Sequence, residues 1–398
     1  MAGASHENTV LVIGGGIGGM GCALALTQAG FDVELMEQAP EIGEIGAGIQ
    51  LGPNAFAAMD ALGCGPRARA RAVYTDDLIM MDAVDESVVG KISAGEAFRA
   101  RFKNPYAVIH RADIHQSIYE EVQTKKNVHF HTNSHIVGFD IDDKGVRATD
   151  SNGKEYRGIA LIGCDGVKSV VRQKLVGDGH RVPGHVVYRA VTPRDEFPAD
   201  LRWNAATIWV GPNCHLVHYP MRGGEQYNIV VTFHSREKEE WGVREGSREE
   251  VQSYFTHIAD RPRQLIDKPT SWRRWTIADR DPVLKWGEGR ATLLGDAAHP
   301  MLQYMAQGAC MALEDAVTLR EALRVNNNDL QKAFRLYEEK RIPRTARVVY
   351  SAREMGRLFH AGGAERLVRN QLWKGRTQER YYDALEWIYG WSVDKCLD

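Results

Sequence analysis

The stretch NTVLVIGGGIGG, residues 8–19, decides the fold of this chain. A short apolar run leads directly into glycines with the spacing G-x-G-x-x-G, namely Gly14, Gly16 and Gly19. Small apolar residues at helical spacing follow, and a second strand-like run ends at Glu37. Such glycines allow a tight turn and close approach to a pyrophosphate, and an acid at the end of the second strand can bind ribose hydroxyls. The pattern predicts a Rossmann-like dinucleotide site, with a purely structural glycine turn as the alternative.

A second decisive stretch, GDAAHPMLQYMAQGACMALEDA, covers residues 295–316. The apolar run 291–294 ends in Gly295 and Asp296, a turn at Pro300 follows, and a helix is expected to open near Gly308. An acid at the carboxyl end of a strand, beside a glycine-opened helix N-terminus, can hold a sugar hydroxyl and a phosphate or a flavin edge. The two stretches stand at opposite ends of the chain, so one cofactor would draw both ends of the fold together.

Three shorter motifs lie between these stretches. The loop GAGIQLGPNA, residues 46–55, contains Gln50 and is by itself also compatible with an ordinary glycine-rich loop. Arg111 precedes an expected amphipathic helix over 112–122, where Asp113 is a capping-type acid. A cation there suits a pyrophosphate, and a solvated helix-start arginine is the alternative. In ALIGCDGVKSVVR, residues 160–172, a strand ends at Asp165 before a helix, and a plain N-cap network is the alternative.

In their order and spacing, these motifs resemble those of the single-component FAD-dependent aromatic hydroxylases, the class A flavoprotein hydroxylases. The likeness covers roughly residues 1–320. It implies FAD as cofactor, with NADH as a transient co-substrate. Within the class it is closest to the 3-hydroxybenzoate 6-hydroxylases, with the salicylate hydroxylases as nearest competitor. The residues that it assigns to cofactor binding are Gly14, Gly16, Gly19, Glu37, Gln50, Arg111, Asp165, Asp296 and Gly308.

Composition narrows the class of protein. The chain has 398 residues and a formal net charge of −2, which gives no electrostatic case for binding nucleic acid. We find no leader pattern and no apolar run long enough to span a bilayer. The six cysteines form no C-x-x-C pair and the histidines no metal-ligand spacing, so we expect no metal and a cytoplasmic location. Oxygen chemistry would then need an organic cofactor.

The predicted fold class is α/β, with a Rossmann-like FAD-binding domain interleaved with a mostly antiparallel substrate sheet and a C-terminal helical region. Short strand-like runs separated by turn residues predict the antiparallel sheet. We expect the FAD-binding domain over 1–75, 105–182 and 283–335, and the substrate domain over 76–104 and 183–282. Residues 336–398 form the helical region, whose aromatic-rich end would pack on the main body or on a second subunit. A homodimer is therefore a weaker expectation.

The run CHLVHYP, residues 214–220, predicts a chamber for the substrate. Because side chains alternate along a strand, His215 and Tyr219 share one face with Val217 between them, and His218 faces the other way. From the residues alone, a satisfied core pair is the alternative. The resemblance assigns the substrate role to His215 and Tyr219, together with Gln303. Arg189 is a further candidate, either for a carboxylate or for an interdomain salt bridge.

The resemblance implies a function. Reduced flavin reacts with dioxygen to give a flavin 4a-hydroperoxide, an electrophilic oxygen donor, and a phenol reacts faster when it is deprotonated. A histidine with a pKa of about 6.5 can take that proton near neutral pH, which is the role expected of His215. We expect conversion of 3-hydroxybenzoate to 2,5-dihydroxybenzoate (gentisate) with NADH and dioxygen. The alternatives are a decarboxylating salicylate 1-hydroxylase and, from another class, a flavoprotein reductase or dehydrogenase.

Overall fold

A five-stranded parallel sheet forms the centre of one half of the protein, and its order β19-β12-β1-β2-β8 joins distant parts of the chain. The computed structural model describes residues 6–43 and 47–398. Both faces of the sheet are covered, which is why β1 and β12 are apolar and buried throughout. The strands are β1 (Thr9–Ile13), β2 (Asp32–Met36), β8 (Val128–His131), β12 (Ala160–Gly163) and β19 (Ala291–Leu293).

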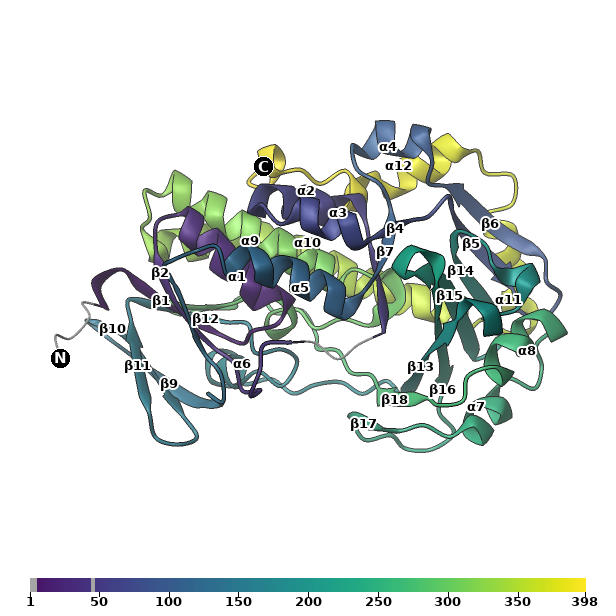
Figure 1. The fold of residues 1–398 in the computed structure, drawn as a ribbon, viewed down its shortest axis with the longest axis horizontal. Coiled ribbons are helices and arrows are strands. Elements are labelled where there is room, and N and C mark those ends of the chain that lie inside the picture. Colours follow the sequence, from purple (N-terminus) through teal and green to yellow (C-terminus); the bar gives the residue numbers. More distant parts are fainter. Residues whose placement is uncertain (1–5, 44–46) are drawn as a thin grey trace.

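Helices from both ends of the chain cover this sheet. The small residues of α1 let α9 approach closely, and α10 runs along α9 through the length of the molecule (Figure 1). The apolar side chains of these helices and of the parallel sheet form one continuous core. The helices of this half are α1 (Ile17–Gln28), α2 (Pro53–Leu62), α3 (Gly65–Arg71), α5 (Arg111–Val122), α6 (Val170–Leu175), α9 (Gly308–Val325) and α10 (Leu330–Phe359).

An eight-stranded sheet forms the other half, in the order β17-β18-β13-β16-β15-β14-β5-β6. All neighbouring strands are antiparallel except β14 and β5. Its strands are β5 (Asp77–Asp82), β6 (Val88–Ser93), β13 (His185–Pro193), β14 (Ala205–Gly211), β15 (Cys214–Met221), β16 (Gln226–His234), β17 (Gly242–Glu245) and β18 (Arg273–Thr276). One face packs on α7 (Arg248–Tyr254) and α8 (Asp260–Asp267) through a second apolar core. The predicted fold class is confirmed.

Two small sheets complete the fold, in the orders β11-β10-β9 and β3-β7-β4. Their strands are β9 (Ile136–Asp142), β10 (Gly145–Asp150), β11 (Glu155–Gly158), β3 (Gly48–Leu51), β7 (Ala107–His110) and β4 (Val73–Tyr74). The aromatic-rich end of the chain forms α11 (Gly363–Leu372) and α12 (Gln378–Tyr389). Tyr382 and Tyr389 on α12 pack edge-on against Phe98 and Phe102 on α4 (Glu96–Phe102), so this region contacts the main body.

Helix α5 departs from the expectation at its N-terminus. The ring nitrogen Nδ1 of His110 accepts the N–H of Ala112 and caps the helix, whereas Asp113 lies in the first turn. Asp113 instead pairs with Arg222 at 3.4 Å. A histidine can cap as an acid does because its neutral ring carries one acceptor nitrogen. No helix within residues 6–43 and 47–398 is long and apolar enough to cross a membrane.

Candidate active site

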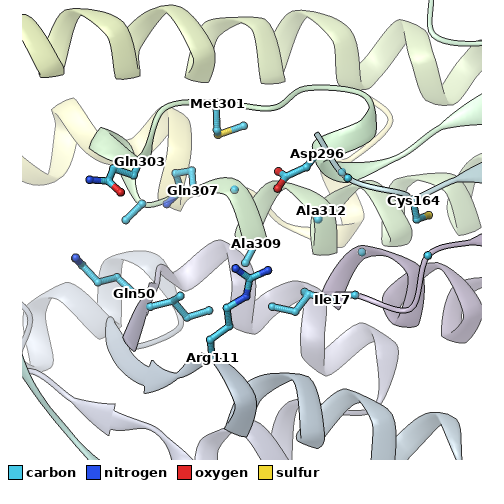
Figure 2. Close-up of a pocket in the computed structure, with 18 of the residues that line it drawn as sticks. Ile17, Gln50, Arg111, Cys164, Asp296, Met301, Gln303, Gln307, Ala309 and Ala312 are labelled. Atoms are coloured by element: carbon cyan, nitrogen blue, oxygen red, sulfur yellow. The ribbon is translucent and has the colours of Figure 1, made fainter. Parts of the chain in front are cut away.

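A large cavity of about 960 Å³ lies where the two halves meet. Its walls include the turns after β1, β2, β12 and β19, the start of α9, and the inner faces of β13, β15 and β16. Figure 2 shows Gln50 and Gln303 at one end of the cavity and Ile17 and Cys164 at the other. The cavity therefore has a nucleotide end, under the parallel sheet, and a substrate end, under the eight-stranded sheet.

Main-chain groups form the nucleotide end. A Cβ at Gly14 would lie 2.4 Å from the carbonyl oxygen of Cys164, and one at Gly19 would lie 1.8 Å from that of Gly14. Glycines at these two positions let β1, β12 and α1 pack closely. Helix α1 starts at Ile17, after Gly16, and no side chain caps its first N–H groups. Gly16, Ile17 and Gly18 line the cavity, so these N–H groups are available to a ligand there. Such a helix start attracts a phosphate group.

Glu37 stands at the end of β2 on the same wall. Its carboxylate accepts the N–H of Gly15 at 2.7 Å and the N–H of Ala39 at 2.8 Å. These bonds hold the acid beside the glycine turn, as the ribose-binding role predicted from the sequence requires. The glycine turn and Glu37 thus come from one continuous segment of chain.

The turn after β19 carries Asp296 on the short helix η5 (Gly295–Ala297). Asp296 is exposed to the cavity, although nearly all its neighbours are buried, and no described residue hydrogen-bonds its carboxylate. In Figure 2 it points toward the cavity from the wall that holds Met301. Gly308 begins α9 close by, since a Cβ there would lie 3.8 Å from Oδ1 of Asp296. A carboxylate and an open helix start therefore lie side by side.

Asp315 on α9 stabilises the turn after β19 from the side away from the cavity. It accepts the N–H of Gly295 at 3.0 Å, lies 2.5 Å from Nε2 of His299, and accepts Nε of Arg341 at 2.6 Å. Burial raises the pKa of Asp315, but the attraction of His299 and Arg341 outweighs it and lowers the pKa to about 2. The Asp315 carboxylate is fully buried and cannot reach a ligand. Its role in the second motif is to hold the turn in place.

Glu314, its neighbour on α9, has a similar structural role. Arg341 and Arg344 of α10 both donate to its Oε2 at 2.6 Å. Asn54 donates to the other carboxylate oxygen at 2.7 Å and also to Gln307, which lines the cavity. Sequence reasoning missed Arg341, Arg344, Asn54 and Gln307, because no local pattern connects α2, α9 and α10.

The three shorter motifs also reach the cavity. Gln50 lines the cavity from β3, and Arg111 lines it from the start of α5. Figure 2 shows Arg111 extending toward Ala309 on the opposite wall. Asp165 lines it too, but its carboxylate accepts Ser169 Oγ at 2.5 Å and Val170 N–H at 2.7 Å. The N-cap network is therefore present at α6, whatever else Asp165 does. Gly46 of the glycine-rich loop lies outside the described residues.

Side chains of β13 and β15 form the substrate end. His215, Val217 and Tyr219 all line the cavity, whereas His218 is buried on the opposite face against Phe197 and Trp203. The ring of Tyr219 packs so closely on β3 that a Cβ at Gly48 would lie 2.5 Å from it. Burial raises the pKa of the Tyr219 hydroxyl, so this residue stays neutral and can only donate or accept a hydrogen bond.

Gln303 and Arg189 complete the substrate end. Gln303 lies on the short helix η6 (Gln303–Met305), where its amide donates to Thr232 Oγ1 at 2.8 Å. Nη2 of Arg189 lies 3.5 Å from the Gln303 amide oxygen. Within the described parts of the chain, no acid forms an ion pair with Arg189. Burial lowers the pKa of its guanidinium, Tyr219 raises it and the charge of Arg111 lowers it, and the net effect is a decrease. The interdomain salt bridge considered from the sequence is not present there.

His215 belongs to a cluster of histidines that sequence reasoning missed. Its Nδ1 lies 2.8 Å from Nε2 of His360, and the Tyr304 hydroxyl lies 2.7 Å from Nδ1 of His185. Burial, followed by the influence of His185, lowers the pKa of His215 to about 3. The expected pKa of about 6.5 is therefore wrong for the protein without substrate. His360 has no local sequence signal, since it is the last turn of α10 that brings it to β15.

Comparison with known proteins places the chain. A sequence profile of the FAD binding domain family matches residues 7–352. The 3-hydroxybenzoate 6-hydroxylase of Polaromonas naphthalenivorans (strain CJ2) is 66% identical over 388 residues, covering 98% of this chain and 97% of that protein. The protein of that name from Klebsiella oxytoca is 60% identical, with 98% of each chain covered.

The chain belongs to the FAD-dependent aromatic hydroxylases. Solved structures of this fold agree. A salicylate hydroxylase in complex with substrate superposes with a TM-score of 0.82 at 24% identity, over 99% of this chain and 98% of that one. Klebsiella pneumoniae HpxO complexed with FAD and uric acid gives 0.83 at 25% identity, over 99% and 97%. The cofactor of this hydroxylase is FAD.

The nucleotide end fits FAD in its chemistry. The uncapped start of α1 suits the pyrophosphate, and the carboxylate of Glu37, which lines the same wall, would accept hydrogen bonds from ribose hydroxyls. Asp296 is an acid with no hydrogen-bond partner among the described residues, beside the open start of α9, which suits polyol hydroxyls and the flavin edge. When bound, FAD supplies two-electron transfer and the activation of dioxygen.

Proposed function

We propose that this hydroxylase converts 3-hydroxybenzoate to 2,5-dihydroxybenzoate, using NADH and dioxygen. The new hydroxyl enters para to the existing one. Relatives that match it over nearly their whole length carry the name 3-hydroxybenzoate 6-hydroxylase, at 66% and 60% identity. The substrate end of the cavity offers this aromatic acid one partner for each of its functional groups, as follows.

The observation that carries the proposal is that no acid among the described residues pairs with the guanidinium of Arg189. Burying a cation without a counter-ion is unfavourable, and binding an anion relieves that cost. Arg111 lies close enough to depress its pKa further, so the cavity wall carries two cations. A carboxylate can accept two parallel hydrogen bonds from a guanidinium. We therefore assign the substrate carboxylate to Arg189, with the Gln303 amide beside it.

Sheet register supports a partner for the phenol across from Arg189. Arg189 pairs with Val230 on β16, and Val230 pairs with Val217 on β15. All three line the cavity, and His215 and Tyr219 stand on either side of Val217. Two strand spacings separate Arg189 from Val217, about 10 Å along the sheet. A benzene ring lying along this row would meet Arg189 with its carboxylate and His215 or Tyr219 with its hydroxyl.

His215 is the better partner for the phenol because its ring can both accept and donate a proton. Its Nδ1 contacts His360, so Nε2 is the nitrogen left for the cavity. Accepting the phenolic proton there makes the ring of the substrate electron-rich at the para carbon. Tyr219 keeps its proton and orients the substrate, and a correctly held ring reacts faster by an entropic advantage.

Product analysis tests the proposal. FAD-loaded protein is mixed with NADH, air and 3-hydroxybenzoate, and with salicylate in parallel, and products are separated by chromatography. We expect gentisate from 3-hydroxybenzoate and little product from salicylate. Catechol and carbon dioxide from salicylate would instead identify a salicylate 1-hydroxylase. NADH oxidation without an oxygenated product from either acid would contradict the proposed substrate, and absence of substrate-dependent dioxygen uptake would indicate a reductase.

The co-substrate and the setting are part of the same proposal. We assign NADH rather than NADPH by family likeness, and the ratio of kcat/KM for the two nucleotides measures this preference. A cytoplasmic location agrees with six free cysteines. A homodimer would use exposed apolar side chains such as Leu367, Val368 and Leu372 on α11, and the sedimentation coefficient of the FAD-loaded protein distinguishes it from a monomer.

A further inference from the structure

We propose that His215 and His360 form a two-histidine relay that carries the phenolic proton of the bound substrate out of the cavity. The proposal rests on the proposed function, because it needs a phenol beside His215. His360 touches neither substrate nor cofactor in this scheme. It is a positioning and proton-transfer residue that acts through His215.

The two rings lie in series between the cavity and the outside. His215 lines the cavity and is 2% exposed, whereas His360 does not line it and is half-buried. Nδ1 of His215 and Nε2 of His360 are 2.8 Å apart, a normal hydrogen-bond distance. The N–H of Asn213 donates to the carbonyl of His360 at 2.9 Å and fixes the end of α10 beside β15. Tyr304 and Phe359 pack against the His215 ring and close the other sides.

Burial, and then the positive charges around the pair, disfavour a proton resting on it. His185 on β13 lies with its ring centroid 5.4 Å from that of His360 and 5.2 Å from that of His234, which is exposed. Arg181 adds positive charge near His185, and no acid among the described residues pairs with any ring of the cluster. Burial and these neighbours lower the pKa of His185 to about 4 and that of His360 well below its usual value.

One proton enters the pair and one leaves it, so neither ring ends charged. The phenol gives its proton to Nε2 of His215, the Nδ1 proton of His215 passes to Nε2 of His360, and the Nδ1 proton of His360 leaves to water. Both rings have then changed tautomer. His215 now donates Nε2–H to the phenolate oxygen and accepts Nε2–H of His360 at Nδ1. Only neutral hydrogen-bonded states are needed at rest.

This scheme resolves the difficulty that a histidine with a pKa of about 3 is a weak base. Water is the final acceptor, so the equilibrium depends on how strongly the site stabilises phenolate, and not on the pKa of His215. The relay determines how fast the proton leaves. A residue that only held His215 in place would affect binding rather than the rate of proton release.

Proton release on binding tests the relay without turnover. Oxidised, FAD-loaded enzyme is mixed rapidly with 3-hydroxybenzoate in weakly buffered solution containing a pH indicator, with no NADH. The wild type should release protons as it binds. His360→Gln keeps a hydrogen-bonding amide next to His215 but cannot exchange tautomers. We expect its Kd within about threefold of wild type, and release at least about tenfold slower. His257→Gln, a change at an exposed histidine, should leave the rate unaltered.

A second variant separates proton transfer from structure. His360→Ala removes the ring, and added imidazole should restore the release rate because a small base can replace the missing acceptor. Equal release rates for wild type and His360→Gln would overturn the relay, as would a slow His360→Ala that imidazole does not restore. Gentisate formation by a wild type that releases no proton would overturn the relay alone. Failure to form gentisate at all would instead contradict the proposed function.

Discussion

The two ends of the cavity are built in different ways. At the nucleotide end, the groups that face the cavity are main-chain atoms and acids at strand ends, held by glycine turns within short segments. At the substrate end, they are side chains from β13, β15 and η6, brought together by sheet register and by the end of α10. A site built from closely packed main-chain atoms has no room for an added Cβ atom, whereas a site built from side chains can lose one of them and keep its shape.

A substitution at Gly19 should have the largest effect on the nucleotide end, on both its folding and its FAD binding. Its Cβ would lie 1.8 Å from a carbonyl oxygen, whereas a Cβ at Gly138 on β9 would meet nothing within 4 Å. We expect Gly19→Ala to lower the free energy of unfolding by at least about 3 kcal/mol and to abolish FAD retention. Gly138→Ala should change neither by much. Urea denaturation and the ratio of FAD to protein measure both. A Gly19→Ala protein with one FAD per chain would show that the cradle has room.

The substrate end should lose chemistry without losing FAD when His215 is removed. We expect His215→Ala to cut gentisate formation by about 10²-fold or more, because the proton acceptor is gone. NADH oxidation should persist in part. Chromatographic product assay and the flavin spectrum are the measurements, with His257→Ala as control. Undiminished hydroxylation would remove His215 from the mechanism.

Replacing Arg189 should weaken recognition of the substrate carboxylate alone and so sharpen the comparison between the two ends. Arg189→Met keeps an unbranched, flexible side chain and removes its charge, so we expect KM for 3-hydroxybenzoate to rise about 30-fold, a loss of about 2 kcal/mol. The neutral analogue 3-hydroxybenzyl alcohol should be affected little. Steady-state kinetics with both compounds checks this, and Arg335→Met on the exposed face of α10 is the matched control. An equal rise for both compounds would mean that Arg189 does not bind the carboxylate.

Asp315 should make the free energy of unfolding depend on pH in acid solution. Folding lowers its pKa from 3.8 to about 2, so it adds stability above the unfolded pKa and loses it as the pH falls through the folded one. Wild type should lose about 2 kcal/mol of unfolding free energy between about pH 5 and pH 2 that Asp315→Asn does not lose. Urea midpoints across that range measure it. Asp143→Asn, an exposed change, should keep the wild-type dependence.

Asp296 should show the smallest effect, and on FAD alone. It is exposed and has no partner in the part of the chain that the structure describes, so Asp296→Ala should leave the melting temperature of the apoprotein unchanged. Loss of one hydrogen-bonded acid should weaken FAD binding by about tenfold. Titration of apoprotein with FAD measures the Kd. Full FAD affinity in this variant would mean that the acid of the second motif does not contact the cofactor.

Sequence reasoning succeeded where one segment supplies all the groups. The spacing of Gly14 and Gly19 with Glu37 specified a strand, a turn, a helix and an acid, and the structure forms these elements with Gly14 and Glu37 on one wall of the cavity. Alternation along residues 214–220 likewise put His215 and Tyr219 on a shared face, because side-chain direction in a strand is a local property.

Sequence reasoning failed where the partners of a residue lie in a distant part of the chain. Glu314 and Asp315 stand in the second motif, yet their partners Arg341 and Arg344 lie on another helix. The pKa of His215 followed from burial and from neighbouring histidines, neither of which local sequence reveals.

The sequence by itself determined the fold class, the FAD cradle and the faces of the strands, because turn geometry and side-chain alternation depend on neighbouring residues. Only the tertiary structure decided which charges meet. It left Arg189 without an acid among the described residues, paired Asp315 with Arg341, and brought His360 next to His215. The physical reason is that electrostatic interactions depend on burial and distance, which are set by packing between elements far apart in the chain.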